Sequence, residues 1–264
     1  MVTMTNNRKI KICVTERGDA ALDLSWQDKI DSVNGAVLIT KRLSKQFCEA
    51  VLALKDRVII HATVTGYGQT IVEPNCPTVD QTLTAAKFLL SQCFPLERIV
   101  IRIDPIIPTE KGIARAKDVF IKFIDAGFER FRVSIIDMYP HVRDRFIQAR
   151  LPLPYGNDFA PTKEQIAAVD AMLAEVKTYY RQNRISVDDL CELHIQSCAE
   201  PGLTQAEPSG CISEYDLRIL GYETSPEDFQ GYQRTHCKCF SGKTELLTQK
   251  HPCAHNCLYC FWQH

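Results

Sequence analysis

Residues 35–65 read GAVLITKRLSKQFCEAVLALKDRVIIHATVT, and this stretch decides the fold class. It begins with a short apolar run at 36–40, which is typical of a strand buried on both faces of a parallel sheet. Residues 44–55 then open with a serine that can cap a helix and carry apolar side chains at helical spacing. Residues 57–65 are rich in β-branched side chains and predict a second strand. A strand, a helix and a strand in this order indicate a parallel α/β fold.

The same alternation continues on both sides of this unit. It predicts further strands at 9–14, 99–103, 130–136 and 190–196, and helices at 77–89, 111–126 and 161–183. Six strands separated by helices predict a parallel sheet with right-handed crossovers, either an open barrel or a doubly wound sheet. We expect the α/β barrel to occupy residues 1–198, with 199–264 as a cysteine-rich segment packed on its mouth in one structural unit.

Polar residues gather at the carboxyl ends of the predicted strands, where parallel α/β folds form their sites. They are Thr15, Glu16, Arg17, Thr40, Lys41, Thr65, Tyr67, Asp104, Asp137, Cys198 and Glu200. Tyr67, Arg102, Asp104 and Asp137 are the candidate catalytic residues. Arg102 and Asp104 lie two residues apart and so share a strand face, either as a buried structural pair or as a clamp on a substrate. Lys41 is either a solvated lysine or a point charge for an anion.

Twelve cysteines distinguish this chain, and seven of them lie between residues 198 and 260. In a cytosolic protein, clustered thiols more often bind metal or take part in catalysis than form disulfides. The other five are scattered through strand and helix patterns, where we expect them to pack as small apolar groups. These are Cys13, Cys48, Cys76, Cys93 and Cys191.

Four of the clustered cysteines could close one centre by themselves. They are Cys198, Cys211, Cys237 and Cys239. We interpret them as ligands of an auxiliary iron–sulfur cluster, with structural zinc or simple reduced thiols as the alternatives. The firmest part is the pair at 237 and 239, because two thiols one residue apart rarely serve packing alone.

The remaining three cysteines stand in the stretch CAHNCLYC, residues 253–260. Three soft ligands on one short loop suit an iron–sulfur or a zinc centre. A closed structural zinc site needs four ligands, and a histidine would have to supply the fourth. The candidates for that role are His251, His255 and His264.

The spacing CxxxCxxC with an aromatic residue before the last cysteine resembles the signature of the radical S-adenosylmethionine (SAM) enzymes. In that superfamily the motif stands near the amino terminus, whereas here it follows the predicted strands. This permuted order resembles a family of bacterial and phage proteins, a domain of unknown function related in its cysteine cluster to spore photoproduct lyase. The matching pieces, before the terminal cluster, are LITK (38–41), TVTGYG (63–68), EPN (73–75), RIDPII (102–107), SIIDMY (134–139), CAE (198–200) and QRTHCKC (233–239).

The resemblance implies a circularly permuted, partial (β/α)6 radical-SAM-like barrel. Cys253, Cys257 and Cys260 would hold a [4Fe–4S] cluster whose free iron binds SAM, and Tyr259 would lie against the SAM adenine. Lys41, Thr65 and Glu200 are the other candidate cofactor-binding residues, Lys41 for the SAM carboxylate and Glu200 for its amino group. A flavodoxin or ferredoxin would supply the electron that cleaves SAM to a 5′-deoxyadenosyl radical.

The same resemblance implies a nucleotide, a modified nucleobase or a DNA lesion as the substrate class of a lyase or isomerase. A mutase or isomerase of a modified base or an amino-acid adduct is a second hypothesis. The third is a non-catalytic iron–sulfur or zinc module, because only four residues follow Cys260 to cover a cluster. Arg143, Arg145 and Arg150, with Phe146 between them, are either a phosphate-binding patch or one face of an ordinary amphipathic helix.

Charge and hydropathy exclude several other classes. A formal net charge of −1 gives no general attraction to nucleic acid or anionic membranes. No run approaches the ~18 apolar residues of a membrane span. The start, MVTMTNNRKIKI, lacks the apolar core of a signal peptide. We therefore expect a cytoplasmic protein with no membrane partner.

Overall fold

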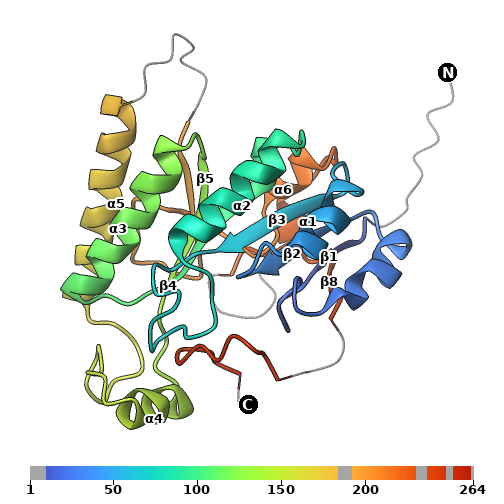
Figure 1. Cartoon of the computed structure of the whole chain (residues 1–264). Helices are drawn as coiled ribbons and strands as arrows, with labels where there is room; N and C mark the ends of the chain where they lie inside the picture. Colours follow the sequence, from blue (N-terminus) through green and yellow to red (C-terminus); the bar gives the residue numbers. More distant parts are fainter. Residues whose placement is uncertain (1–9, 184–191, 230–236, 248–251, 263–264) are drawn as a thin grey trace, which may run out of the picture.

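The computed structural model describes residues 10–183, 192–229, 237–247 and 252–262, and they form an α/β fold around one parallel sheet (Figure 1). In this described part the sheet has eight strands and curls into a half-barrel. The strands are β1 (Ile12–Val14), β2 (Gly35–Thr40), β3 (Val58–Thr63), β4 (Ile99–Ile106), β5 (Arg130–Ile135), β6 (His194–Cys198), β7 (Glu207–Ser209) and β8 (Lys243–Glu245).

The strand order is β7-β6-β5-β4-β3-β2-β1-β8, and every neighbouring pair is parallel. Strands β1 to β7 therefore follow one another around the sheet without the reversal that defines a doubly wound fold. Of the two predicted architectures, the open barrel is the one that forms. Its two edges are β7 and β8, each three residues long.

Helices connect most of these strands. They are α1 (Lys45–Leu52), α2 (Val79–Ser91), α3 (Glu110–Asp125), α4 (Pro140–Gln148), α5 (Lys163–Asn183) and α6 (Glu214–Ile219), with 3₁₀ turns at Leu24–Ser32, Leu96–Arg98 and Pro226–Phe229. Ser44 caps α1 through the amide of Phe47, and Thr78 forms a capping box with Gln81 at α2. Both helix starts agree with the sequence prediction, because a hydroxyl at the cap satisfies an otherwise unpaired amide.

The sheet has a different apolar core on each face. Alternate strand residues such as Leu38 and Ile60 pack under the outer helices, which contribute Phe47, Phe120 and Phe123. The residues between them point to the inner face, where they meet α6, Phe240 and three cysteines. The inner-face strand residues are Ile12, Val14, Val37, Ile59 and Val100. Consequently part of the cysteine-rich segment fills the inside of the half-barrel.

A buried ionic cluster fixes α6 against β5 inside the half-barrel. The carboxylate of Asp216 pairs with Arg130 at 2.6 Å and with Arg132 at 3.5 Å, and none of these side chains is more than 5% exposed. Arg130 also donates to the carbonyl of Glu97 at 2.6 Å. Burial of such charges is tolerated only when each has its partners.

The predicted strands and helices are found with small shifts of their ends, apart from Lys9 and residues 190–191, which lie outside the described residues. The count of six strands is wrong. The barrel pattern does not stop at Cys198, because β7 and β8 come from the cysteine-rich segment and extend the sheet at both edges. A strand of three residues is too short to show a period of two, so neither could be recognised in the sequence.

No helix within the described ranges combines the length and the apolar character needed to cross a membrane.

Candidate metal centre and cofactor site

The CAHNCLYC loop is held where the chain leaves β3, by backbone and side-chain bonds to the segment that follows this strand. Leu258 N donates to the carbonyl of Val72 at 3.0 Å, and Asn75 Nδ2 donates to the carbonyl of Ala254 at 2.7 Å. Figure 1 shows this loop in red, on the side of the sheet where α4 lies. The loop therefore reaches the strand ends at which the sequence predicts a site.

His255 forms the third connection of the loop to the barrel. Its Nε2 lies 2.9 Å from Oδ2 of Asp19, and its Nδ1 lies 3.5 Å from the carbonyl of Asn75. Burial alone would raise the pKa of Asp19, but the hydrogen bond with His255 and its charge hold it below the ordinary value. Both ring nitrogens already have partners, so His255 acts as an anchor and not as a fourth metal ligand. His251 and His264 lie outside the described residues.

Arg145 of α4 binds the backbone of the same loop. Its guanidinium donates to the carbonyls of Cys260 and Trp262 at 2.7 Å each, and to those of Leu258 and Cys257 at 3.3 and 3.5 Å. Arg145 therefore anchors the loop, and its guanidinium is already engaged with backbone carbonyls. The helical interpretation of this region is confirmed by α4.

The three thiols of the loop lie close enough to affect one another. Burial raises the pKa of Cys253 to about 11, with smaller contributions from Cys257 and Cys260, and burial also raises the pKa of Cys260. The pKa of Cys257 is raised most by a hydrogen bond with Cys76 and then by burial. None of the described cysteines is in a disulfide. The thiols are thus reduced, and metal binding would have to displace their protons.

Cys76 is the fourth thiol at this site, and the sequence prediction that it only fills space is incomplete. Its Sγ lies 3.5 Å from Sγ of Cys257, and both side chains are buried. Cys76 belongs to the loop that leads into α2, three residues after Glu73. The sequence feature that could have indicated this part of the site is the spacing of a glutamate and a cysteine three residues apart in a loop.

Glu73 organises three of the predicted cofactor-binding residues. Its Oε1 accepts hydrogen bonds from Lys41 at 2.8 Å, from Thr65 at 2.7 Å and from the hydroxyl of Tyr259. Lys41 also lies 2.5 Å from the Tyr259 hydroxyl. Burial alone would lower the pKa of Lys41, but the charge of Glu73, followed by those of Cys257 and Cys76, raises it above the ordinary value. Glu73 follows no strand pattern, so the sequence does not predict it as a site residue.

The second set of cysteines forms a row inside the half-barrel. Cys198 is hydrogen-bonded to Cys211 and Cys237, which raises the pKa of Cys198 well above the ordinary value. Cys211 is bonded in turn to Cys198 and Cys239, which lowers the pKa of Cys211 well below the ordinary value. The amide of Cys211 also donates to Sγ of Cys239 at 3.0 Å. The four predicted ligands are therefore brought together.

Arg102 and Asp104 stand beside this second set. They form an ion pair, and Ser134 donates to the same carboxylate. Burial would raise the pKa of Asp104, but Arg102 holds it below the ordinary value. Arg102 also interacts electrostatically with Cys211 and Cys198, so its guanidinium is one of the positive charges beside the second cysteine set.

The other predicted site residues divide between two places. Tyr67 packs under Arg115, whose guanidinium carbon lies 5.2 Å from the ring centre. Burial raises the pKa of Tyr67, Arg115 opposes this shift, and Glu73 adds to it. Glu200 accepts from the amide of Ile135 at 2.9 Å. Glu200 and Asp137 both contribute to the raised pKa of Tyr155, after burial, so they lie near the ends of β5 and β6. They are not in the group around Glu73.

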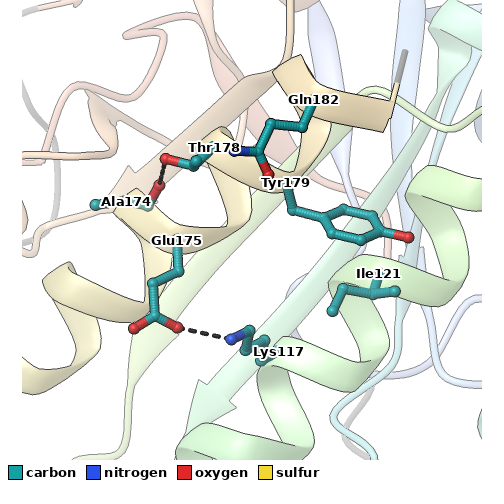
Figure 2. A pocket seen from close by; sticks show the side chains of 7 residues that line it. All are labelled: Lys117, Ile121, Ala174, Glu175, Thr178, Tyr179 and Gln182. Carbon is teal, nitrogen blue, oxygen red and sulfur yellow. Dashed lines mark hydrogen bonds and ion pairs between the residues drawn. The ribbon is translucent and has the colours of Figure 1, made fainter. Parts of the chain in front are cut away.

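Two surface hollows lie in different parts of the molecule. One, of about 440 Å³, is bordered by Ala199, Glu200, Pro201, Pro208, Phe229, Cys237 and Lys238. The other, of about 480 Å³, lies between α3 and α5 and is drawn in Figure 2. Its polar contacts include the ion pair of Lys117 with Glu175 at 2.7 Å and the hydrogen bond from Thr178 to the carbonyl of Ala174 at 2.9 Å, and none of the candidate residues borders it. The hollow with Glu200 and Cys237 is thus the one that concerns the site.

A family model described as Domain of unknown function (DUF1848) matches residues 23–262. The chain belongs to the DUF1848 family. No curated protein and no solved structure matches it. The sequence resemblance predicted membership of a family of unknown function, and this part of the prediction is confirmed. The relation of the DUF1848 chain to radical SAM enzymes and to spore photoproduct lyase stays a prediction.

Proposed function

We propose that this DUF1848 chain is a radical SAM enzyme, with Cys253, Cys257 and Cys260 as ligands of a [4Fe–4S] cluster. The observation that carries the proposal is the fixing of three free thiols at the strand ends by Arg145, His255 and Asn75. When bound, the reduced cluster would supply the electron that breaks the S–C5′ bond of SAM, which gives methionine and a 5′-deoxyadenosyl radical.

The donor set fits a cluster better than a single ion. In the described part of the chain, the three motif thiols do not form a group whose sulfurs all lie within 4.8 Å of one another. The thiolates of a four-iron cluster each bind a different iron, so they surround the cluster instead of converging on one point.

Lys41 and Glu73 have the charges needed to bind the amino-acid part of SAM. Their opposite charges are 2.8 Å apart, with exposed side-chain fractions of 15% and 3%, and the thiol of Cys257 is close to both. An ammonium ion suits a carboxylate ligand, and a carboxylate suits an amino group. Tyr259 adds an aromatic surface for the adenine, and Thr65 holds Glu73 in place.

The second cysteine set is the proposed auxiliary centre, for an iron–sulfur cluster or for zinc. Its thiolates would be close to Arg102, whose charge would offset part of theirs. Asp104 keeps Arg102 oriented, and Asp137, Tyr67 and Glu200 remain candidate contacts for the substrate or SAM. The electron would come from a flavodoxin or a ferredoxin.

A nucleotide, modified nucleobase or DNA lesion remains the proposed substrate class. An aromatic group beside the loop favours it: Tyr139 lies 4.9 Å from Phe159 and 6.5 Å from Phe261, and Phe261 lies 4.7 Å from Trp262. Phe159 and Phe261 are 46% and 49% exposed. Exposed aromatic rings can stack with bases. A mutase or isomerase of a modified base or amino-acid adduct is the second proposal.

The test is formation of 5′-deoxyadenosine from SAM by anaerobically reconstituted protein with dithionite. We expect the wild type to form it, and Cys253→Ala and Cys260→Ala to form none. Cys93→Ser is the matched control, because Cys93 is exposed and lies between α2 and β4. Equal product from Cys253→Ala and the wild type would contradict the assignment of the motif.

Metal content separates the enzyme from the non-catalytic alternative. About four irons per chain would support the terminal cluster alone, and about eight would support both clusters. Stoichiometric zinc without iron, persisting after reconstitution, would exclude the radical chemistry and leave a structural zinc module.

A further inference from the structure

The separation of Cys76 and Cys257 is that of two ligands on one metal ion. Their sulfurs are 3.5 Å apart. A disulfide bond is about 2.0 Å long. Two thiolates that each lie about 2.3 Å from a tetrahedral zinc are separated by roughly 3.8 Å. The two sulfurs therefore need to move only slightly to bind a common ion.

Glu73 provides a third ligand atom at the same place. A carboxylate oxygen of Glu73 and the two sulfurs all lie within 4.8 Å of one another, and all three side chains are buried. Among the described histidine, cysteine, aspartate and glutamate side chains, this is the one group of three that converges so closely. The hydrogen bonds to Glu73 from Lys41, Thr65 and Tyr259 all use Oε1, which leaves the lone pairs of Oε2 for a metal.

The backbone already holds these ligands in position. The amide of Cys76 donates to the carbonyl of Glu73 at 3.3 Å, and the amide of Glu73 donates to the carbonyl of Thr70 at 3.1 Å. Cys257 stands on the loop that Arg145 binds. Little ordering is left for the metal to impose, and such preorganisation favours binding.

The local charges also suit a divalent cation. Two thiolates and one carboxylate carry three negative charges, which the ammonium of Lys41 and one divalent ion together neutralise. Lys41 bonds Glu73 through Oε1 at 2.8 Å, so it supports the site without occupying the lone pairs of the sulfurs. Thiolate ligands select a soft or borderline metal over calcium or magnesium.

We propose that Glu73, Cys76 and Cys257 form a mononuclear site for a thiophilic divalent cation of the Zn²⁺ type. With three protein ligands, the fourth position of a tetrahedral ion stays open to water. Cys257 belongs both to this site and to the proposed cluster, so the two cannot be filled together. The mononuclear site does not depend on the proposed radical chemistry, because it uses neither Cys253 nor Cys260.

The experiment is a titration of metal-free, reduced full-length protein with Co²⁺, followed by competition with Zn²⁺. We expect Cys76→Ser to lose part of the cobalt–thiolate absorption and to bind Zn²⁺ at this site at least about tenfold more weakly. Absorption from the second cysteine set persists in both proteins and therefore cancels in the difference. Cys93→Ser, with the same chemical change at an exposed position, should titrate like the wild type.

Cys253→Ser separates this proposal from the proposed function. It should retain the part of the cobalt signal that Cys76→Ser loses, while failing to reconstitute the terminal cluster. An unchanged signal in Cys76→Ser, or an equal loss in both variants, would overturn the mononuclear site. A protein that binds cobalt as expected but forms no cluster would overturn the proposed function alone.

A measurement on the wild type covers the case in which Cys76→Ser does not fold. Stoichiometric Zn²⁺ should slow the alkylation of Cys76 and Cys257 by N-ethylmaleimide at least about tenfold, with peptide mapping by mass spectrometry as the readout. The alkylation rate of Cys253 should not change. Zinc protection of Cys253 and Cys260 without Cys76 would overturn the proposal.

Discussion

Glu73 is the residue on which the candidate site depends most directly. It is 2% exposed and accepts bonds from side chains of three separate segments, namely Lys41 after β2, Thr65 after β3 and Tyr259 in the cysteine loop. A buried carboxylate that pairs with a lysine keeps both charges compensated. The negative charge of Glu73 therefore contributes to the stability of the fold, in addition to the hydrogen bonds that its carboxylate accepts.

Glu73→Gln should lower the free energy of unfolding of the metal-free protein by about 3 kcal/mol, because it leaves the largely buried ammonium of Lys41 without a countercharge. The double variant Glu73→Gln/Lys41→Met should recover most of this loss, since it removes both charges. Urea unfolding followed by circular dichroism measures all three proteins. Additive losses in the double variant would show that the two charges are not coupled.

The strand-end rule predicts some site residues and misses others. Lys41, Thr65 and Tyr67 lie at or just beyond the carboxyl ends of predicted strands, so their location at one edge of the sheet follows from the topology. Glu73 and Cys76 lie in an irregular loop, where no period links a residue to a position in space. Their approach to Cys257 depends on contacts between residues more than 180 positions apart in the chain. No local pattern in the sequence indicates such contacts.

Helix α4 is the element that supports the cysteine loop. Arg145 uses two of its nitrogens to bind four loop carbonyls. The planar guanidinium can donate to several acceptors at once, which the single ammonium of a lysine cannot match. The sequence left an amphipathic helix as one of two interpretations of this region, and it gave no indication that Arg145 contacts the cysteine loop.

Arg145→Met should loosen the loop without unfolding the barrel, because the bonds of His255, Asn75 and Leu258 to the rest of the chain remain. We expect faster amide exchange at residues 254–260 and a lower iron content after reconstitution. Hydrogen exchange with mass spectrometry and iron analysis measure the two effects. Arg150→Met, at an exposed position two residues beyond the end of α4, is the control and should behave like the wild type. Unchanged exchange in Arg145→Met would contradict the anchoring role.

At the scale of the whole molecule, the ion pairs of Asp216 connect α6 inside the half-barrel to the sheet. Arg130, Arg132 and His61 face this carboxylate. Burial would raise the pKa of Asp216, but the arginines hold it well below its ordinary value of 3.8. The native state therefore binds fewer protons there than the unfolded state does. Its contribution to stability is complete above that ordinary value and is lost as the pH falls below it.

Asp216→Asn should lower the free energy of unfolding at pH 7 by about 3–5 kcal/mol, because two buried arginines lose their counterion. The variant should also lose part of the steep fall in stability that the wild type shows below the ordinary aspartate pKa. Urea unfolding at a series of pH values tests both effects. Asp118→Asn, at an exposed position of α3, should keep the wild-type curve. Parallel acid curves for Asp216→Asn and the wild type would contradict this account.

The parallel α/β fold class could be predicted because β2 to β6 are long enough to show their buried character, and because helices separate them. The same pattern left an open barrel and a doubly wound sheet as alternatives, and only the family resemblance favoured the barrel. The two edge strands, β7 and β8, could not be predicted from the sequence. β8 pairs with β1 over a distance of more than 200 residues, and Glu245 fixes this contact by accepting from the amides of Glu16 and Arg17 at 2.9 and 3.2 Å. Such a pairing depends on tertiary contacts and not on a local pattern.

The pairing of β8 with β1 has a consequence for protein synthesis. During translation β1 leaves the ribosome long before its partner strand exists, and the segment after β3 is likewise made before the cysteine loop that covers it. The nascent barrel therefore carries an unpaired sheet edge and an uncovered strand-end face until residues 243–260 have been added. Exposed edges of this kind are sites of misassembly. A chain that stalls on the ribosome before codon 243 would keep this edge of β1 unpaired, and the proposed terminal cluster could form only after Cys260 had been added.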